Sequence, residues 1–433
     1  MELYPVYLLC FLCLVRTSLQ KSCHKTLLVS FDGCRWDFIN RGNTPTFDRL
    51  AREGVRAPYI HGTFITKTFP SHWSVITGLW EESHGITANS MYDSVLNQTF
   101  VLRTKDPEWW DVGSMPVWQT AQSQGLKAAD LFWPGGDVLM NGQHVNIYRK
   151  YNQSMPFTDR VDTVVGWFVK ENVDFATLYF HQPDETAHIH GPDSQNVTTK
   201  MAELDGVLQY LLQKVEDAGL SDQLNIIVTA DHGMAEISRD RKIQIYNYVD
   251  RSLISRIPDA GPVANIQPVD GKLQEVYNIL KAAHPNMTVY LREEVPERMH
   301  YTHNRRIMPI VALADEGWEV IPSESEVTDY KLNLKGAHGY DNMLMNMKPI
   351  FLARGPRFKR GYQATPFYAV DIYNLICELL GVTPAPNNGT WERVSDLLVP
   401  LSAGDVTCGG VSLAVSWASL LLVITSLMCS TLF

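Results

Sequence analysis

Residues 26–32 read TLLVSFD, a short, mostly apolar run that ends in an aspartate. Two further runs have the same form: FATLYF at 175–180, which continues to an aspartate at position 184, and LNIIVTAD at 224–231. Apolar runs of this length are typical of strands buried on both faces, as parallel sheets require. The three segments therefore predict neighbouring strands of a parallel sheet, followed by the carboxylates of Asp32, Asp184 and Asp231.

Helical patterns separate these runs. They cover residues 44–53, 161–172 and 198–218, the last of them closed by Gly219. Strands that alternate with helices predict an α/β fold, with a largely parallel central sheet covered by helices on both faces. The carboxyl ends of such strands converge on one edge of the sheet, so we expect the three aspartates to face a common site. Residues 250–295 mix Pro, Gly and short strand signals, which indicates an inserted lobe without firm edges.

Three histidines accompany the aspartates. Asp184 and His188 are four positions apart, which places them on one face of a helical turn. Asp231 and His232 are adjacent at the end of a strand, and we expect Gly233 to permit the local break that lets both reach one ion. A further histidine, His338, lies between glycines at 336 and 339.

Each of these residues has an ordinary explanation when it is taken alone. An aspartate at a strand end often caps the next helix, and most single histidines are not metal ligands. Three buried carboxylates together would repel one another without a cation, however. Oxygen and imidazole ligands in this ratio suit zinc, and they suit manganese or iron less well.

A possible nucleophile lies in the segment KTFPSH at 67–72. It precedes an apolar helical pattern that runs to Gly78, with Pro70 in the first turn. Thr68 is therefore expected at a helix N-terminus, where free N–H groups and the helix dipole favour a phosphate, although a simple N-cap is the alternative. A metal contact would activate its hydroxyl. Asn89, in ESHGITANSMYD at 82–93, adds an amide that can donate to a phosphoryl oxygen.

Composition excludes some classes of function. The chain has 433 residues and a net charge of −10, without any run of five or six Lys and Arg. A protein that coats nucleic acid needs a basic face, so we exclude that class. Of the seven cysteines, Cys10, Cys13 and Cys429 lie in terminal apolar segments, and Cys23, Cys34, Cys377 and Cys408 are too far apart to indicate a disulfide scaffold.

Both termini carry targeting signals. The apolar stretch 4–15 predicts a signal peptide over about residues 1–20, although Glu2 is atypical and a buried first strand is the alternative. Residues 401–433 form an anchor segment, either a glycolipid-anchor signal with small residues at 402–404 or a transmembrane helix. Five sequons predict N-glycans, at Asn97, Asn152, Asn196, Asn286 and Asn388. The expected location is the cell surface, with residues 25–400 as an extracellular catalytic domain.

Several strings in the chain occur in order at the spacing of a known family. They are LLVSFDGCRWDF, FITKTFPSHWSVITGL, EESHGITANSMYD, FWPGGDV, PDETAHIHGP, TADHGM, ALADEGW and GAHGYDN. Over about residues 25–395 the chain resembles the ectonucleotide pyrophosphatase/phosphodiesterase family of the alkaline-phosphatase superfamily, and it is most similar to the short members four and five. The resemblance implies an alkaline-phosphatase-like fold.

The resemblance also implies roles for individual residues. Two zinc ions are expected, one held by Asp32, Thr68, Asp231 and His232 and the other by Asp184, His188 and His338. Thr68 would be the nucleophile, while Asn89 and the Phe69 N–H stabilise the transition state. Substrate would contact Lys67, Phe69, Tyr148, Trp133 and Tyr179, with Phe69 and Tyr148 stacking on a nucleobase.

Some positions depart from the family pattern. Ser71, Trp73, Cys34, His181-Gln182 and Thr186-Ala187 replace residues that are common in the family. None of them is an expected metal ligand. The pair at 181–182 replaces two acidic residues, which is expected to alter the charge preference for substrate.

The function expected from these residues is hydrolysis of nucleotides or dinucleotides to nucleoside 5'-monophosphates through a threonyl phosphate. One alternative is a phosphodiesterase acting on choline lipids, or less favourably a phosphomonoesterase. Another is a surface recognition protein that holds zinc without turnover.

Overall fold

The central sheet is built on the three strands that the sequence predicts. The structure is a computed structural model that describes residues 24–400; the predicted leader and anchor segments, with all cysteines other than Cys34 and Cys377, lie outside the described residues. Strand β1 (Lys25–Phe31) pairs in parallel with β7 (Phe175–Phe180) on one side and with β8 (Leu224–Thr229) on the other. All three aspartates therefore lie at one edge of the sheet.

Five further strands complete an eight-stranded sheet. Its order is β18-β2-β17-β8-β1-β7-β5-β6. The added strands are β18 (Tyr362–Gln363), β2 (Val55–Ala57), β17 (Phe351–Arg354), β5 (Ala128–Leu131) and β6 (Ile147–Arg149). Only β17 runs antiparallel to its neighbours. The prediction of a largely parallel α/β fold is confirmed.

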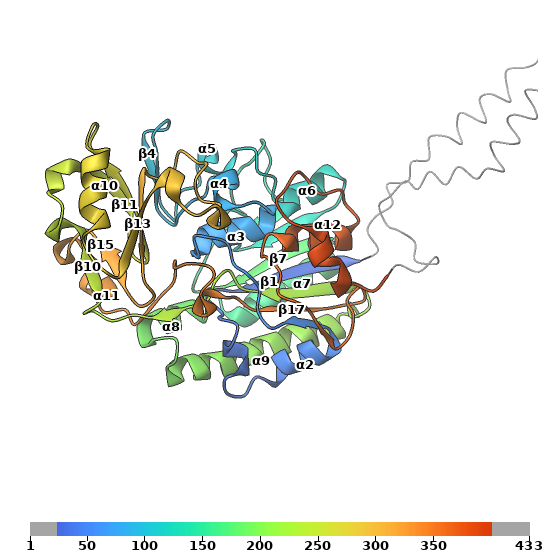
Figure 1. Cartoon of the computed structure of the whole chain (residues 1–433). Coiled ribbons are helices and arrows are strands. Elements are labelled where there is room, and N and C mark those ends of the chain that lie inside the picture. Colours follow the sequence, from blue (N-terminus) through green and yellow to red (C-terminus); the bar gives the residue numbers. More distant parts are fainter. Residues whose placement is uncertain (1–23, 401–433) are drawn as a thin grey trace, which may run out of the picture.

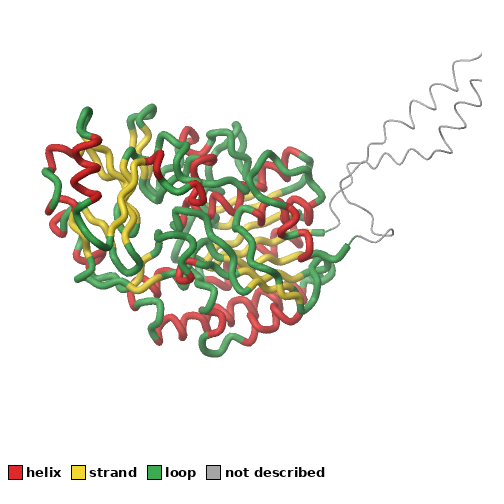
Figure 2. Tube along the Cα trace, viewed as in Figure 1, coloured by secondary structure: helices red, strands yellow, loops and turns green. Residues whose placement is uncertain are grey.

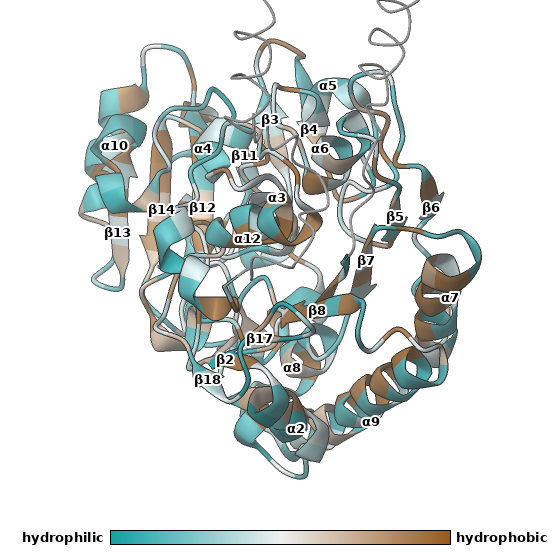
Figure 3. Ribbon diagram, turned by 90° about the vertical axis from the view of Figure 1, so that its right-hand side faces the viewer, coloured by the Kyte–Doolittle hydropathy of each residue, from teal (hydrophilic) through white to brown (hydrophobic). Residues whose placement is uncertain are grey.

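Helices cover both faces of this sheet (Figure 1). Helices α2 (Pro45–Glu53), α7 (Phe157–Lys170) and α9 (Gln195–Asp217) pack on one face, and α3 (Thr68–Thr77), α6 (Val117–Ser123) and α12 (Asp371–Leu380) pack on the other. Side chains along a strand point alternately to the two faces of its sheet. Leu28 of β1 therefore belongs to the core formed with α3, α6 and α12, whereas Leu27 and Val29 belong to the core formed with α2, α7 and α9. In Figure 3, polar and apolar residues alternate along α9, whose apolar side faces the sheet.

Two of these helices begin earlier than their apolar periodicity indicates. Helix α7 begins at Phe157 and α9 at Gln195, upstream of the predicted starts at 161 and 198. The start signals are Pro156 and Ser194, and the Ser194 side chain accepts a hydrogen bond from the Val197 N–H. The apolar positions begin only after the first turn, so periodicity alone places the start too late.

The inserted lobe is a second sheet with its own core, seen apart from the central sheet in Figure 2. It consists of β11 (Ile254–Asp259), β12 (Val263–Pro268), β14 (Ile310–Ala314) and β13 (Met287–Leu291) in that spatial order, with α10 (Leu273–Lys281) packed against it. The predicted range 250–295 ends too early, because β14 inserts between β12 and β13. Strands β10 (Lys242–Gln244) and β15 (Glu319–Ile321) pair beside it.

The described part of the chain has neither a disulfide nor a membrane span. Cys34 and Cys377 are both buried as free thiols. Between residues 24 and 400, no helix combines the length and the apolar character needed to cross a bilayer.

Candidate metal and catalytic site

The three aspartates meet where their strands end. Asp32 directly follows β1, Asp231 lies two residues after β8, and Asp184 is the first residue of α8 (Asp184–His190), which follows β7. Gly33 brings two of these segments together: its φ is +66°, and an added Cβ would lie 2.8 Å from the Asp184 Cβ. The Gly33 N–H also donates to Asp231 Oδ1 over 3.0 Å. The close approach of the carboxylates therefore depends on this glycine.

Gly233 serves a purpose different from the predicted one. Its φ is not in the left-handed region, and an added Cβ would lie 2.0 Å from the carbonyl oxygen of Asn346. The glycine is needed because another backbone segment passes close by, rather than for an unusual φ. Asp231 and His232 nevertheless both reach the cluster.

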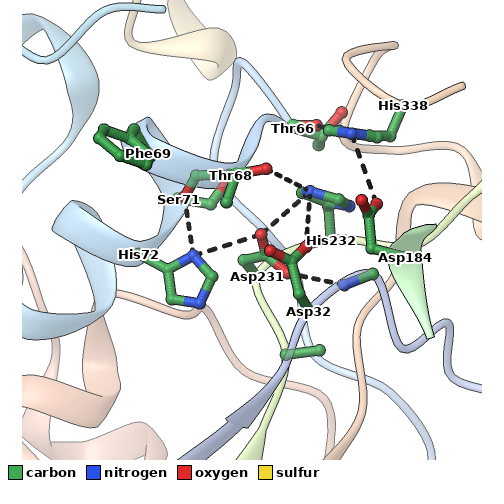
Figure 4. A network of polar contacts seen from close by, with 12 residues as sticks. Asp32, Thr66, Thr68, Phe69, Ser71, His72, Asp184, Asp231, His232 and His338 are labelled. Atoms are coloured by element: carbon green, nitrogen blue, oxygen red, sulfur yellow. Dashed lines mark hydrogen bonds and ion pairs between the residues drawn. The ribbon is translucent and has the colours of Figure 1, made fainter. Parts of the chain in front are cut away.

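Figure 4 shows the rings of His232 and His338 beside the carboxylates of the cluster. His232 Nε2 lies 3.0 Å from Asp231 Oδ2 and 3.6 Å from Asp32 Oδ1. Asp184 Oδ1 lies 3.3 Å from His188 Nε2 and 3.6 Å from His338 Nε2. The structure thus brings together all six predicted Asp and His ligands.

Each of these histidines has its other ring nitrogen anchored on the backbone. Nδ1 lies within hydrogen-bond distance of a carbonyl oxygen in every case: 2.7 Å to Gly336 for His188, 2.9 Å to Gly233 for His232 and 2.8 Å to Thr66 for His338. A proton held on Nδ1 leaves Nε2 with a free lone pair. Metal-binding histidines are oriented in this way.

Three carboxylate oxygens in the cluster accept no hydrogen bond from any described residue. They are Oδ1 of Asp32, Oδ1 of Asp184 and Oδ2 of Asp231. Burial and the two neighbouring carboxylates raise the pKa of Asp32 well above its usual value, and burial is the main cause that raises the pKa of Asp184 to about 7. Burial alone would also raise the pKa of Asp231, but the adjacent His232 and His72 lower it well below its usual value.

These observations fit a divalent cation. Without one, the three carboxylates cannot all be ionised in so small a buried volume. Ligand-type atoms form two close groups that share His232: Asp32, Asp231 and His232, and Asp184, His232 and His338. The imidazole and carboxylate donors are those that zinc prefers.

Thr68 is the first residue of α3 and lies beside this cluster. Its Oγ1 is 3.4 Å from His232 Nε2. The N-cap residue of α3 is Lys67. The alternative interpretation of Thr68 as a simple N-cap is therefore wrong. The N–H groups of this helix terminus are less available than expected, because Pro70 has none and the Phe69 N–H donates to Asn89 Oδ1 over 2.9 Å. That bond leaves the Asn89 Nδ2 as a donor for a bound phosphate.

The cluster opens into a cavity of about 590 Å³. Loops after β4 (Gln98–Phe100), β5 and β6 form much of its wall. Of the predicted site residues, Asp32, Thr68, Phe69, Trp133, Tyr179 and Asp184 line it. The Tyr179 hydroxyl donates to Asp32 Oδ2 over 2.5 Å, and the Trp133 Nε1 donates to the His72 carbonyl over 3.1 Å.

Two predicted substrate contacts lie elsewhere. Lys67 is buried and its ammonium group pairs with Asp259 of β11, so its charge is neutralised within the protein. Tyr148 lies within β6, stacks on His144 and packs against the core. Neither residue lines the cavity, whereas Tyr151, just beyond the end of β6, does.

Sequence reasoning also missed His72. This buried histidine contacts the Thr68 carbonyl through Nδ1 at 2.8 Å and the Ser30 hydroxyl through Nε2 at 2.9 Å. Its Nδ1 is also 3.3 Å from Asp231 Oδ2. The spacing of four residues from Thr68 on a predicted helix was the available signal, because residues i and i+4 share a face.

A buried carboxyl outside the ligand cluster predicts a pH-dependent stability. Burial raises the pKa of Asp130 to about 7 from an ordinary value of 3.8. The folded protein therefore keeps this proton as the pH rises from 4 to 7, while the unfolded chain releases it, so the free energy of unfolding falls over that window. The Asp130→Asn variant lacks this titration. Between pH 4 and 7 its free energy of unfolding should therefore fall by up to about 4 kcal/mol less than that of the wild type.

Chemical denaturation at pH 4, 5.5, 7 and 8 measures the effect. In the Asp130→Asn variant the amide oxygen can still accept the hydrogen bond that Thr177 donates, so the fold is expected to survive. Asp222→Asn, at an exposed aspartate, is the matched control. Parallel pH curves for wild type and Asp130→Asn would contradict the prediction.

A largely parallel sheet that ends in an Asp and His cluster able to hold a metal ion, beside a threonine, is the arrangement expected of a hydrolase with an alkaline-phosphatase-like fold. The family model described as type I phosphodiesterase / nucleotide pyrophosphatase matches residues 26–341. The chain belongs to this family, whose members are metal-dependent phosphodiester hydrolases.

Relatives and solved structures agree. The chain is 43% identical over 385 residues to human ectonucleotide pyrophosphatase/phosphodiesterase family member 5. This match covers 88% of this chain and 79% of the relative. It is also 43% identical over 380 residues to human bis(5'-adenosyl)-triphosphatase ENPP4, and this match covers 87% of this chain and 82% of the relative. The structure of inactive murine ectonucleotide pyrophosphatase/phosphodiesterase 5, a threonine-to-alanine variant in complex with AMP, matches with a TM-score of 0.83 and 42% identity, over 87% of this chain and 100% of that one.

Proposed function

We propose that this enzyme hydrolyses nucleotides or dinucleotides to nucleoside 5'-monophosphates, using two zinc ions and a threonyl phosphate intermediate. The observation that carries the proposal is the donor set itself. Three histidines with anchored Nδ1 atoms present Nε2 to carboxylate oxygens that lack hydrogen-bond donors, and the Thr68 hydroxyl adjoins them. The human relative named bis(5'-adenosyl)-triphosphatase and the AMP complex of the murine relative support a nucleotide substrate.

The chemistry follows from the residues around Thr68. We assign one zinc ion to Asp32, Thr68, Asp231 and His232, and the other to Asp184, His188 and His338. When bound, these ions would neutralise phosphoryl charge and lower the pKa of the threonine hydroxyl. Asp32 and Asp231 are both fixed by donors, from Tyr179 and Gly33 respectively, so their orientation does not depend on the ions alone.

The reaction has two displacements. Thr68 Oγ1 attacks phosphorus, a Thr O–P bond forms and the bond to the leaving oxygen breaks, with the leaving group taking up the proton. Water then attacks phosphorus and the Thr O–P bond breaks, which returns the hydroxyl and releases the monophosphate. The Nδ2 of Asn89 can donate to a phosphoryl oxygen in both transition states, because its Oδ1 is held by the Phe69 N–H. An alanine in place of a threonine yields the inactive murine relative, which supports a threonine nucleophile.

The cavity has room and surface for a nucleoside. We propose that Phe69 and Tyr151 contact the base, with Trp133 and Tyr179 behind them, because all four line the cavity that holds Thr68. Lys67 enters this proposal as a support of the Thr68 helix and not as a substrate contact. Cationic side chains on the same cavity disfavour the trimethylammonium group of a choline lipid.

A substrate pair tests the function directly. We expect the purified enzyme to hydrolyse the nitrophenyl ester of thymidine monophosphate at least 10-fold faster than nitrophenyl phosphocholine, as judged by kcat/KM. Nitrophenyl phosphate controls for phosphomonoesterase activity. Preferential cleavage of the phosphocholine ester would establish the choline-lipid alternative instead, and a zinc-loaded protein without turnover on any ester would contradict the proposal.

Replacing Tyr151 tests the base contact. Stacking of a base on an aromatic ring is worth about 1–3 kcal/mol. We therefore expect Tyr151→Ala to raise the KM for the thymidine ester about 10-fold while kcat changes little. Tyr148→Ala is the matched control and should leave KM unchanged, because that ring stacks on His144. A larger KM increase for Tyr148→Ala than for Tyr151→Ala would instead support Tyr148 as the residue that stacks on the base.

The location proposed for the enzyme is the cell surface. Relatives of this family are generally extracellular or secreted, and we propose export by the leader at 1–20 and anchoring through residues 401–433, both outside the described residues. Of the five predicted glycan acceptors, Asn97, Asn152, Asn196 and Asn388 are exposed. Asn286 is half-buried and its side-chain amide donates to Asp315.

A further inference from the structure

The cavity beside Thr68 has a basic rim, which we define as Arg103, Arg149 and Lys150. All three residues line the cavity and all three are exposed. They come from two separate parts of the chain, the loop after β4 and the end of β6. The lining of the cavity as a whole has four cations and four aspartates, and the chain carries a net charge of −10, so the grouping of three cations in the basic rim is a local feature.

The rim is not neutralised by the protein. A fourth cation on the cavity, Lys105, forms an ion pair with Asp137 over 2.7 Å. The other acidic residue of this part of the wall, Asp130, is buried, and its Oδ1 accepts hydrogen bonds from Thr177 and the Trp133 N–H. Within residues 24–400, no ion pair or side-chain hydrogen bond engages the three cations of the basic rim. Their charge is available to something that enters the cavity.

Two residues of the basic rim, Arg149 and Lys150, come from a strand that is separate from those leading to the ligand cluster. In the sheet, β6 is three strands from β1, which leads to Asp32, and two strands from β7, which leads to Asp184. Strands are about 4.8 Å apart, so Arg149 and Lys150 follow a strand roughly 10 to 14 Å from those that carry the metal ligands. The phosphate that Thr68 attacks is held at the ligand cluster. We infer that a group that engages Arg149 and Lys150 is a different part of the substrate.

Tyr151 indicates which part that is. It directly follows Arg149 and Lys150 and lines the same wall, and it is the residue to which we assign the base contact. Cations that flank the nucleoside end of the cavity recognise an anion on that end most directly. Resting on the proposed function, we propose that the basic rim selects nucleotide substrates that carry a second phosphate group on the nucleoside half.

NAD and NADP test this inference, because they share the pyrophosphate bond and differ by one phosphate on the adenosine ribose. We expect kcat/KM for NADP to exceed that for NAD about 10-fold, equivalent to 1.4 kcal/mol. In the triple variant Arg103→Gln/Arg149→Gln/Lys150→Gln, the two values should become equal while kcat/KM for NAD stays within a factor of about three. The NADP advantage in the wild-type enzyme should shrink as salt rises.

A matched variant controls for net charge. Arg52→Gln/Arg360→Gln/Lys170→Gln removes three exposed cations that do not line the cavity and should keep the preference for NADP. A second substrate pair, diadenosine tetraphosphate and triphosphate, lengthens the phosphate chain instead. The wild-type enzyme could prefer the tetraphosphate and show no preference for NADP. If the rim variant then abolishes the preference for the tetraphosphate, the basic rim contacts a phosphate of the leaving group and the inference is overturned.

The inference and the proposed function fail in different ways. Cleavage of NAD with no preference for NADP, or a preference that the rim variant retains, overturns the inference alone. An enzyme that cleaves neither dinucleotide and also spares the thymidine ester overturns the proposed function, and the inference with it.

Discussion

Replacing Thr68 with alanine is expected to lower kcat for the nitrophenyl ester of thymidine monophosphate by at least about 1,000-fold. The variant removes the oxygen that we propose as the nucleophile. The proposed ligand set includes three aspartates and three histidines besides Thr68, so we expect zinc to be retained. Steady-state kinetics and metal analysis of the same preparation give both answers.

Two variants separate chemistry from packing. Thr68→Ser keeps an attacking oxygen and should retain measurable turnover with the same zinc content. Thr365→Ala removes a methyl and a hydroxyl from an exposed position and should behave as wild type. Quenching the reaction of the serine variant or the wild type in acid should trap thymidine monophosphate covalently linked to the residue at position 68, identified by mass spectrometry. Activity of Thr68→Ala close to that of wild type would rule out covalent catalysis by this residue.

Removal of the metal is expected to have the second large effect. A chelator should abolish turnover, and zinc should restore it, because the reaction needs cations to neutralise phosphoryl charge. The chelated protein should also unfold a few degrees lower, since metal at 100 times its Kd stabilises the native state by about 2.7 kcal/mol. The physical reason lies in the cluster, where Asp32, Asp184 and Asp231 crowd together with oxygens that accept no hydrogen bond in the described structure.

A ligand variant makes the same point without a chelator. His338→Ala should lower zinc content and reduce kcat by about 100-fold or more, because its Nε2 belongs to one of the two close ligand groups. His303→Ala, at a histidine whose side chain is 84% exposed, is the matched control and should change neither quantity. Full activity after exhaustive chelation, with metal absent by analysis, would exclude the two-zinc proposal.

Much of the ligand cluster was predictable because it depends on local rules. Each aspartate follows a buried apolar run, and parallel strands bring their carboxyl ends to one edge. The i, i+4 spacing of Asp184 and His188 needs only one turn of helix. The flanking glycines singled out His338 as a candidate, but its grouping with Asp184 and His188 was implied only by the resemblance, since these residues are far away in sequence.

The substrate wall was less predictable, as Tyr148 and Tyr151 show. They are three residues apart near β6, and both are aromatic. Tyr148 lies inside the strand and packs on His144, while Tyr151 lies past its carboxyl end, where the cavity opens. The expectation for Tyr148 came from the family resemblance, and three residues along the chain are enough to separate a side chain within the strand from one on the cavity.

Lys67 shows the other kind of failure. The family resemblance implied a substrate contact for Lys67, but its ammonium group meets Asp259, which is 192 residues away in the inserted lobe. Burial of a lysine requires such a partner, and no local pattern reveals where a distant strand will deliver one.

Sequence by itself determined the α/β fold class, the three buried strands and the carboxylates and histidines that follow them, because hydrophobic period and strand-end position are local properties. Tertiary structure alone decided which histidine ring nitrogens are held by backbone carbonyls and which carboxylate oxygens lack hydrogen-bond donors. It also decided that Gly233 makes room for the Asn346 carbonyl and that three cations without ion-pair partners line the cavity. Those features are distances and charges between segments far apart in the chain, and only the packing of the folded chain sets them.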